Sequence, residues 1–239
     1  MIGCDCEVCT SPDKKDKRLR SSILVQSAKT SLVVDTGPDF RYQMLRQKIK
    51  HLDAVVFTHP HKDHLAGLDD VRAFNFFSKK HIDIYADSLT EEAVRRDFYY
   101  AFTDTKYPGI PELNLHTISD EPFVVGDISI IPIQVWHLKM PVLGYRFGKF
   151  TYITDANRIE DIEKDKIRNS EVLVLNALRK QKHISHFTLD EAIEMAAEVK
   201  AGTAYFTHLS HQMGKHGDIE AELPDNIHLA YDGLVLDFK

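Results

Sequence analysis

Three histidines and an aspartate lie within six residues, directly after a short apolar run at residues 54–57. The β-branched and aromatic residues of that run predict a buried strand, and Pro60 disfavours helix in the residue before it, so the motif begins on a loop. Neutral imidazole is the commonest metal ligand, and carboxylate oxygen often accompanies it. The spacing H-x-H-x-D-H therefore predicts two ligands for each of two neighbouring metals. The four residues are His59, His61, Asp63 and His64.

The length and composition are those of a globular protein. The chain has 239 residues, of which 43% are hydrophobic and 28% are charged, so it can bury most of its apolar surface in one domain. We therefore expect a single domain over residues 1–239, with residues 1–20 as an N-terminal segment. The net charge of −6 argues against a protein that holds a long nucleic acid, because that affinity comes chiefly from neutralising phosphates.

We expect neither a membrane helix nor an export signal. No apolar run approaches the roughly 18 residues of a membrane helix, and the first residues lack the basic region and apolar core of a signal peptide. We therefore expect a cytoplasmic protein that has no membrane partner.

All three cysteines lie within the first nine residues, with the spacing C-x-C-x2-C. A disulfide framework spreads its cysteines along a chain, whereas such clustering is typical of a metal clip. The cysteines are Cys4, Cys6 and Cys9.

Strand-like and helix-like segments alternate along the chain. We predict helices at 39–48, 89–100, 159–167 and 188–200, and an amphipathic helix with Val71, Phe74 and Phe77 on one face. Thr188 begins a capping box, S/T-x-x-E, and is the predicted N-cap. Region 101–121 has no clear period and is either a lid or a loop packed by its own aromatics. Predicted strands are 23–26, 31–35, 53–57, 82–86, 123–125, 127–135, 142–147, 149–154, 172–175, 203–206, 227–230 and 234–238.

Two strand-rich halves with interspersed helices predict an α/β fold in which two sheets lie face to face with helices outside. Three further ligand-type residues each follow a predicted strand, as the first motif does. They are His137, Asp155 and His208.

This order of residues resembles the metallo-β-lactamase superfamily over nearly the whole chain. The resemblance implies a four-layer αββα sandwich of two mostly antiparallel or mixed sheets with outer helices. It also implies that one metal is held by His59, His61 and His137. The second metal is then held by Asp63, His64 and His208, and Asp155 bridges both.

The two ends of the chain carry a narrower resemblance. Residues 3–9 and 207–212 look like the branch that opens phosphoribosyl 1,2-cyclic phosphate in phosphonate degradation. That branch implies a catalytic histidine before the penultimate helix, here His186. It also implies a structural zinc, for which His183 and His216 are alternative fourth ligands. The implied zinc ligands are Cys4, Cys6, Cys9 and His211.

The expected function is that of a dinuclear metal-dependent hydrolase, a phosphoric diester hydrolase that acts on small cyclic phosphodiesters. A metal-bridged hydroxide is expected to attack phosphorus, Asp63 to orient it and His186 to supply a proton to the leaving group. The active-site metals are zinc or manganese, with iron a further option. The partner is a small phosphorylated substrate, and a homodimer is left open. The alternatives are a tRNA 3′-processing-type ribonuclease and a non-catalytic metal-binding scaffold.

Overall fold

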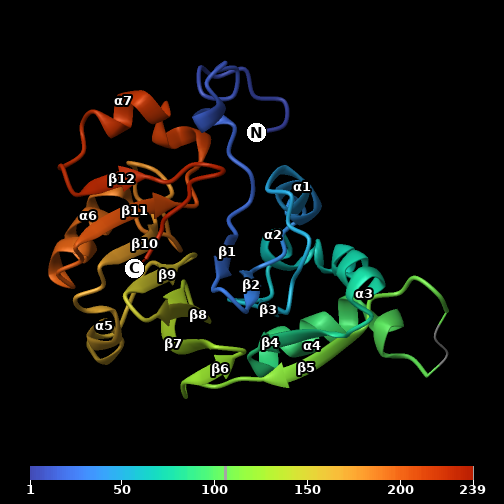
Figure 1. Ribbon diagram of the computed structural model, residues 1–239. Helices are drawn as coiled ribbons and strands as arrows, with labels where there is room; N and C mark the ends of the chain where they lie inside the picture. The colour runs from blue at the N-terminus through green and yellow to red at the C-terminus, as the bar shows by residue number, and fades with distance from the viewer. Residues whose placement is uncertain (105–106, 239) are drawn as a thin grey trace. The chain divides into compact units, whose positions relative to one another are not determined.

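The computed structural model describes residues 1–104 and 107–238. Figure 1 labels the helices and strands used below. The chain divides into two compact units: unit 1 comprises Met1–Leu19 and Ile131–Lys239, and unit 2 comprises Arg20–Ile130. Each unit has its own hydrophobic core. The expectation of a single domain stays a prediction.

Unit 2 contains a five-stranded mixed sheet. β1 pairs antiparallel with β2, whereas β2 to β5 run parallel to one another. In order across the sheet the strands are β1 (Ile23–Gln26), β2 (Ser31–Val34), β3 (Ala54–Val56), β4 (Ile82–Ala86) and β5 (Leu113–Thr117). The helices are α1 (Phe40–Arg46), α2 (Lys62–Leu65), η2 (Leu68–Val71), α3 (Arg72–Ser78), α4 (Ser88–Asp97) and η3 (Tyr99–Phe102). Since the carboxyl ends of parallel strands meet at one edge, the segments that follow β2 and β3 are neighbours.

One face of this sheet packs against the helices. Val33, Val55 and Ile84 are direct neighbours across β2, β3 and β4 and are fully buried. They share one cluster with Phe40 of α1 and Leu65 of α2. The cluster therefore anchors α2, which carries part of the histidine motif, to the sheet.

Two sequence predictions in unit 2 were wrong. The face predicted for α3 includes Phe77, but Phe77 is 78% exposed, while Phe74 is only 8% exposed. Six residues separate Val71 from Phe77, which is not a whole number of helical turns, so Phe77 does not share the face of Val71. β5 lies inside region 101–121, where no element was predicted, because only two of its five residues, both leucines, are apolar. Residues 105–106 of that region lie outside the described residues.

Unit 1 contains most of a second mixed sheet. β6 (Phe123–Val125) and the first residues of β7 form a hairpin within unit 2, and β7 then continues into unit 1. There β7 to β9 are antiparallel and β9 to β12 are parallel. The strands are β7 (Ile128–His137), β8 (Met140–Phe147), β9 (Phe150–Ile153), β10 (Val172–Asn176), β11 (Thr203–Thr207) and β12 (Ile227–Leu229). The helices are η1 (Lys14–Asp16), α5 (Asp161–Ile167), α6 (Leu189–Glu198), η4 (His211–Met213) and α7 (His216–Glu220).

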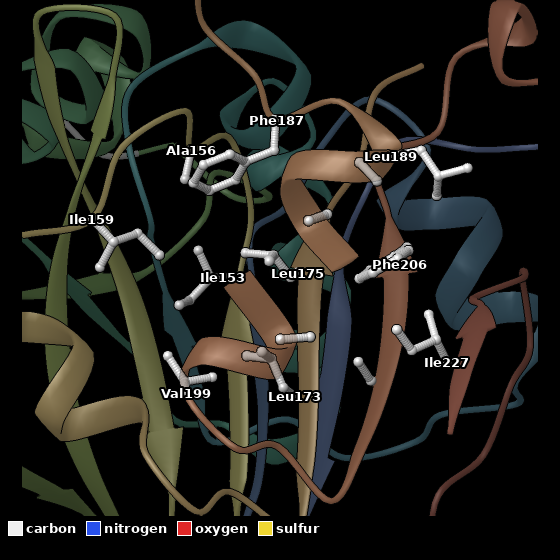
Figure 2. Packing of buried hydrophobic residues seen from close by; sticks show 14 of the residues in the cluster. Ile153, Ala156, Ile159, Leu173, Leu175, Phe187, Leu189, Val199, Phe206 and Ile227 are labelled. Carbon is white, nitrogen blue, oxygen red and sulfur yellow. The ribbon is translucent and has the colours of Figure 1, made fainter. Parts of the chain in front are cut away.

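The core of unit 1 lies between this sheet and α6. Figure 2 shows Leu173, Leu175 and Phe206 of the strands beside the helix, and these three side chains are fully buried. The predicted capping box is confirmed, because the Thr188 hydroxyl accepts from the Glu191 N–H and the Glu191 carboxylate accepts from the Thr188 N–H. This cap fixes where α6 begins, directly after the segment that carries His186.

The end of the described chain differs from its prediction. Residues 234–238 form no strand, and the Phe238 ring instead packs on Phe150 at 5.4 Å between centroids. Among the described residues, no helix has the length and apolar character needed to cross a bilayer.

Candidate metal centre

The histidine motif of unit 2 occupies the loop after β3 and the first turn of α2. The His59 ring lies 4.7 Å from that of His61 and 4.3 Å from that of His64, between centroids. Nε2 of His59 is 3.1 Å from Nδ1 of His61. Two nitrogens on one tetrahedral metal, with bonds of about 2.0–2.1 Å, lie about 3.3 Å apart. The spacing of the rings therefore suits ligands of a shared ion.

A buried carboxylate behind the motif orients two of its histidines. Asp35 follows β2, is fully buried, and accepts from the Thr58 N–H, the Thr58 hydroxyl and Nδ1 of His64, each at 2.8 Å. Since the Thr58 hydroxyl donates to Asp35, it accepts from Nδ1 of His59 at 2.9 Å. In both rings the proton is therefore on Nδ1, and Nε2 carries the lone pair that binds metals.

Asp35 was predicted as the last residue of a strand and not as part of the site, but it hydrogen-bonds to the motif. Its signal is present, since it is a carboxylate that directly follows a buried strand, as the predicted ligands do. Burial raises the pKa of Asp35, and the hydrogen bonds from His64 and Thr58 oppose that rise. Its φ of 64° is left-handed.

A close backbone approach fixes the motif against the segment after β2. A Cβ atom on Gly37 would lie 2.2 Å from the carbonyl oxygen of Asp63. The N–H of Thr36 donates to the carbonyl oxygen of His64 at 2.7 Å. Glycine is therefore required at position 37 for α2 to reach this position.

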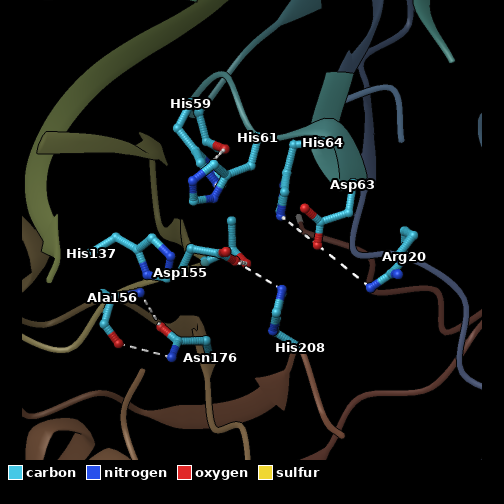
Figure 3. A network of polar contacts seen from close by, with 12 residues as sticks. Arg20, His59, His61, Asp63, His64, His137, Asp155, Ala156, Asn176 and His208 are labelled. Carbon is cyan, nitrogen blue, oxygen red and sulfur yellow. Dashed lines mark hydrogen bonds and ion pairs between the residues drawn. The ribbon is translucent and has the colours of Figure 1, made fainter. Parts of the chain in front are cut away.

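The predicted ligands of unit 1 also lie at strand ends. Nε2 of His208 is 3.1 Å from Oδ1 of Asp155. Figure 3 marks this contact with a dashed line. Asn176 holds the next residue, Ala156, by accepting from its N–H at 2.8 Å and donating to its carbonyl at 2.9 Å. The pair is thus attached to the sheet through β10.

His137 ends β7, and its ring is oriented in the same way as those of His59 and His64. Its Nδ1 lies 2.8 Å from the Ser185 carbonyl oxygen, which can only accept. The proton is therefore on Nδ1, and Nε2 again carries the lone pair. This bond also connects His137 to the segment that contains His186.

His186 is 8% exposed and packs between the predicted ligands of unit 1. Its ring centroid lies 4.8 Å from that of His208 and 4.5 Å from that of His137. Its Nδ1 has no hydrogen-bond partner among the described residues. Burial lowers the pKa of His186 to about 3, so the imidazole is neutral near pH 7. Asp155, His186 and His208 also bring ligand atoms within 4.8 Å of one another, so His186 has the position of either a ligand or a proton donor.

The N-terminal cysteines of unit 1 converge on His211. Sγ of Cys4 and Sγ of Cys6 each lie 3.4 Å from Nδ1 of His211, and the four ligand atoms, with Cys9, are within 4.8 Å of one another. A hydrogen bond from the Cys9 backbone and one from His211 lower the pKa of Cys6 to about 6. A Cys3His set with thiolate character fits zinc.

The two alternative fourth ligands lie elsewhere in unit 1. His216 is buried and hydrogen-bonds through Nε2 to the Leu229 carbonyl oxygen at 3.2 Å. His183 packs against His186 at 5.1 Å between centroids. Among the described residues, His211 is therefore the histidine that lies with the three cysteines.

The donor chemistry of these residues fits divalent metals. Imidazole and carboxylate suit zinc, iron and manganese, and thiolates with one imidazole suit zinc. The three oriented histidines present the nitrogen that a metal requires, and hydrogen bonds to the opposite nitrogen are typical of metal ligands.

Comparison with known proteins identifies the family. The profile of the Beta-lactamase superfamily domain matches residues 30–209, which is more than half of the chain. The chain belongs to the beta-lactamase superfamily. The predicted α/β fold class, with two mixed sheets and helices, is thereby confirmed.

A narrower resemblance of this superfamily member is also confirmed. The chain has 39% sequence identity to a protein of known crystal structure, described as a new diphosphatase from the PhnP family. The two structures superpose with a TM-score of 0.93, and the match covers 100% of this chain and 92% of that one. That neighbour is named as a diphosphatase, and a diphosphatase is a hydrolase.

Two curated proteins are similar in sequence to this superfamily member, over different fractions of its length. An octanoyltransferase of Porphyromonas gingivalis is 37% identical over 236 residues, which are 98% of this chain and 48% of that protein. A ribonuclease Z of Nostoc sp. is 26% identical over 136 residues, which are 55% of this chain and 40% of that protein. The chain thus spans about half the length of the curated relatives it matches.

Proposed function

We propose that this superfamily member is a dinuclear metal-dependent phosphodiesterase. The observation that carries the proposal is the common orientation of three histidines, in which Nδ1 donates to a fixed acceptor and Nε2 carries the lone pair. The proposed first metal set is His59, His61 and His137. The second is Asp63, His64 and His208, with Asp155 shared by both.

In this proposal, residues of the chain orient the metal-binding imidazole rings, and His186 provides a ring N–H. When bound, two divalent metals supply Lewis acidity toward a phosphoryl oxygen and a water molecule. Asp35, Thr58 and Ser185 hold the ligand rings, so little reorganisation is needed during the reaction. His186, which is neutral near pH 7, is proposed to pass its ring N–H proton to the departing oxygen and to regain a proton from water. Asp63 is proposed to orient the attacking water.

The proposed substrate is a small phosphodiester, such as phosphoribosyl 1,2-cyclic phosphate. The support is the 39% identity to a PhnP-family diphosphatase and the net charge of −6, which disfavours long nucleic acids. Because that relative is named as a diphosphatase, diphosphate esters are the second substrate class to test.

A structural zinc is part of the proposal. Cys4, Cys6, Cys9 and His211 would hold it, and the metal would attach the N-terminal segment to η4, three residues after His208. Arg18 supports the same connection, since its guanidinium donates to the carbonyl oxygens of Ser210 at 2.6 Å and Gly214 at 2.7 Å.

The test is hydrolysis of bis(p-nitrophenyl) phosphate and of a panel of cyclic diesters, linear diesters and diphosphates, with metal analysis on the same sample. We expect Asp155→Ala to lose metal and hydrolysis, and the exposed Asp161→Ala of α5 to keep both. Full hydrolysis by Asp155→Ala would contradict the proposal. Metal binding without hydrolysis of any substrate would favour the scaffold, and cleavage of precursor tRNA alone would favour the ribonuclease.

A further inference from the structure

The side chain of Arg20 lies beside a carboxylate of the histidine motif. Nη1 of Arg20 is 3.6 Å from Oδ2 of Asp63. Figure 3 marks this ion pair with a dashed line. The Arg20 side chain is 57% exposed, whereas that of Asp63 is 29% exposed. The guanidinium is therefore next to a proposed metal ligand and accessible to a small anion.

The backbone of Arg20 is fixed, although its side chain is exposed. The N–H of Arg20 donates to Asp39 at 2.8 Å, and its carbonyl oxygen accepts from Nε2 of the buried Gln43 at 2.9 Å. Cβ of Arg20 also lies against Gly37, at 3.1 Å from where a Cβ would be on that glycine. The side chain thus starts from a defined point at the same backbone segment that contacts Asp63.

The ion pair between Arg20 and Asp63 adds little to the stability of the fold. An exposed ion pair at 3.6 Å contributes little, because water screens it and two side chains must be ordered. Lys62, the cation within the histidine motif, is by contrast paired with Asp97. Arg20 instead faces a carboxylate that metal ligation would neutralise, and its planar fork of donors matches two oxygens of a phosphoryl group.

We propose that Arg20 is a substrate-binding residue that holds a phosphoryl group of the substrate next to the metals. The proposal rests on the proposed function, since it takes Asp63 as a metal ligand and a phosphate ester as the substrate. It assigns to Arg20 a role in affinity, not in bond cleavage.

The direct test is binding of inorganic phosphate to the metal-loaded protein, measured by titration calorimetry with metal analysis on each sample. We expect Arg20→Gln to weaken phosphate binding about ten- to a hundredfold, as for loss of a charged hydrogen bond, with metal content unchanged. Arg20→Lys should recover part of the affinity. Arg41→Gln, at an exposed arginine of α1, is the matched control and should bind as the wild type does.

Kinetics with bis(p-nitrophenyl) phosphate give a second readout. Arg20→Gln should raise KM and leave kcat nearly constant. Phosphate binding within about twofold of the wild type would overturn the proposal, and so would loss of metal from Arg20→Gln, which would make Arg20 a positioning residue for Asp63. If the wild type binds no phosphate yet hydrolyses the diester, only the role of Arg20 fails. If it does neither, the proposed function fails as well.

Discussion

Nε2 of His208 lies 3.1 Å from Oδ1 of Asp155, and both residues have a left-handed backbone, with φ of 56° and 55°. Each follows a strand, β11 or β9, and β10 runs parallel between these two strands. Such backbone costs on the order of 1–3 kcal/mol per residue and is concentrated at functional sites. Asn176 at the end of β10 holds the residue after Asp155. The central strand therefore stabilises the strained geometry of the pair.

Replacing His186 separates its two candidate roles. We expect His186→Ala to lower turnover by about 10²- to 10⁴-fold, the usual range for a proton donor, with metal content unchanged. The neighbouring His183→Ala is the control, and its turnover should change far less. Loss of metal in parallel with activity would instead make His186 a ligand, as its position near Asp155 and His208 permits.

Removing one thiolate tests the structural zinc. Cys6→Ser should lose about one zinc per chain and unfold at a lower temperature, because ligand loss removes metal-binding free energy from folding. Metal analysis and thermal unfolding measure the two effects. Glu7→Gln, in the same segment, removes only an exposed ion pair with Lys215 and should keep its zinc. A Cys6→Ser protein with full metal content would reject the zinc site.

The glycine at position 37 should be intolerant of a side chain. Gly37→Ala puts a methyl group 2.2 Å from the Asp63 carbonyl oxygen, so the backbone must shift at a cost of about 1–3 kcal/mol. Denaturant unfolding measures that loss. Gly217→Ala is the matched control, since nothing lies within 4 Å of its added Cβ and it lies in α7, where alanine should stabilise by about 0.5–1 kcal/mol. Equal stabilities for the two variants would refute the close approach.

Acid stability should depend on Glu220, which connects α7 to β12. Burial alone would raise the pKa of Glu220, but hydrogen bonds from the Leu229 N–H and His228 outweigh it and hold that pKa below 4.5. Glu220 therefore stabilises the fold above pH 4.5, and this contribution is lost as the pH falls through its folded pKa. As the pH falls below 4.5, the unfolding temperature should fall more steeply for the wild type than for Glu220→Gln. Parallel curves would show that Glu220 does not contribute.

Several features follow from local sequence because they depend on short-range chemistry. The motif at residues 59–64 follows a strand that is recognisable from its apolar run. Thr188 caps α6 through a capping box with Glu191, three residues later. The cysteine cluster is likewise complete within nine residues. The superfamily was predicted from the order of that motif, His137, Asp155 and His208 along the chain. The match to residues 30–209 confirms the prediction.

Other features depend on contacts between residues far apart in the chain. Asp35 orients His64 from 29 positions away, and Ser185 orients His137 from 48 positions away. Among the described residues, the cluster of ligand atoms around the cysteines includes His211 and neither His183 nor His216.

The sequence by itself identified the candidate metal ligands, because the chemistry of a side chain and its position after a predicted strand are local properties. Only the tertiary structure decided which nitrogen of His59, His64 and His137 carries the lone pair. It also decided that Arg20 lies beside Asp63. The physical reason is that each of these contacts is a hydrogen bond or an ion pair whose partner is set by strand register and helix packing. Strand register and helix packing cannot be deduced from the spacing of residues along the chain.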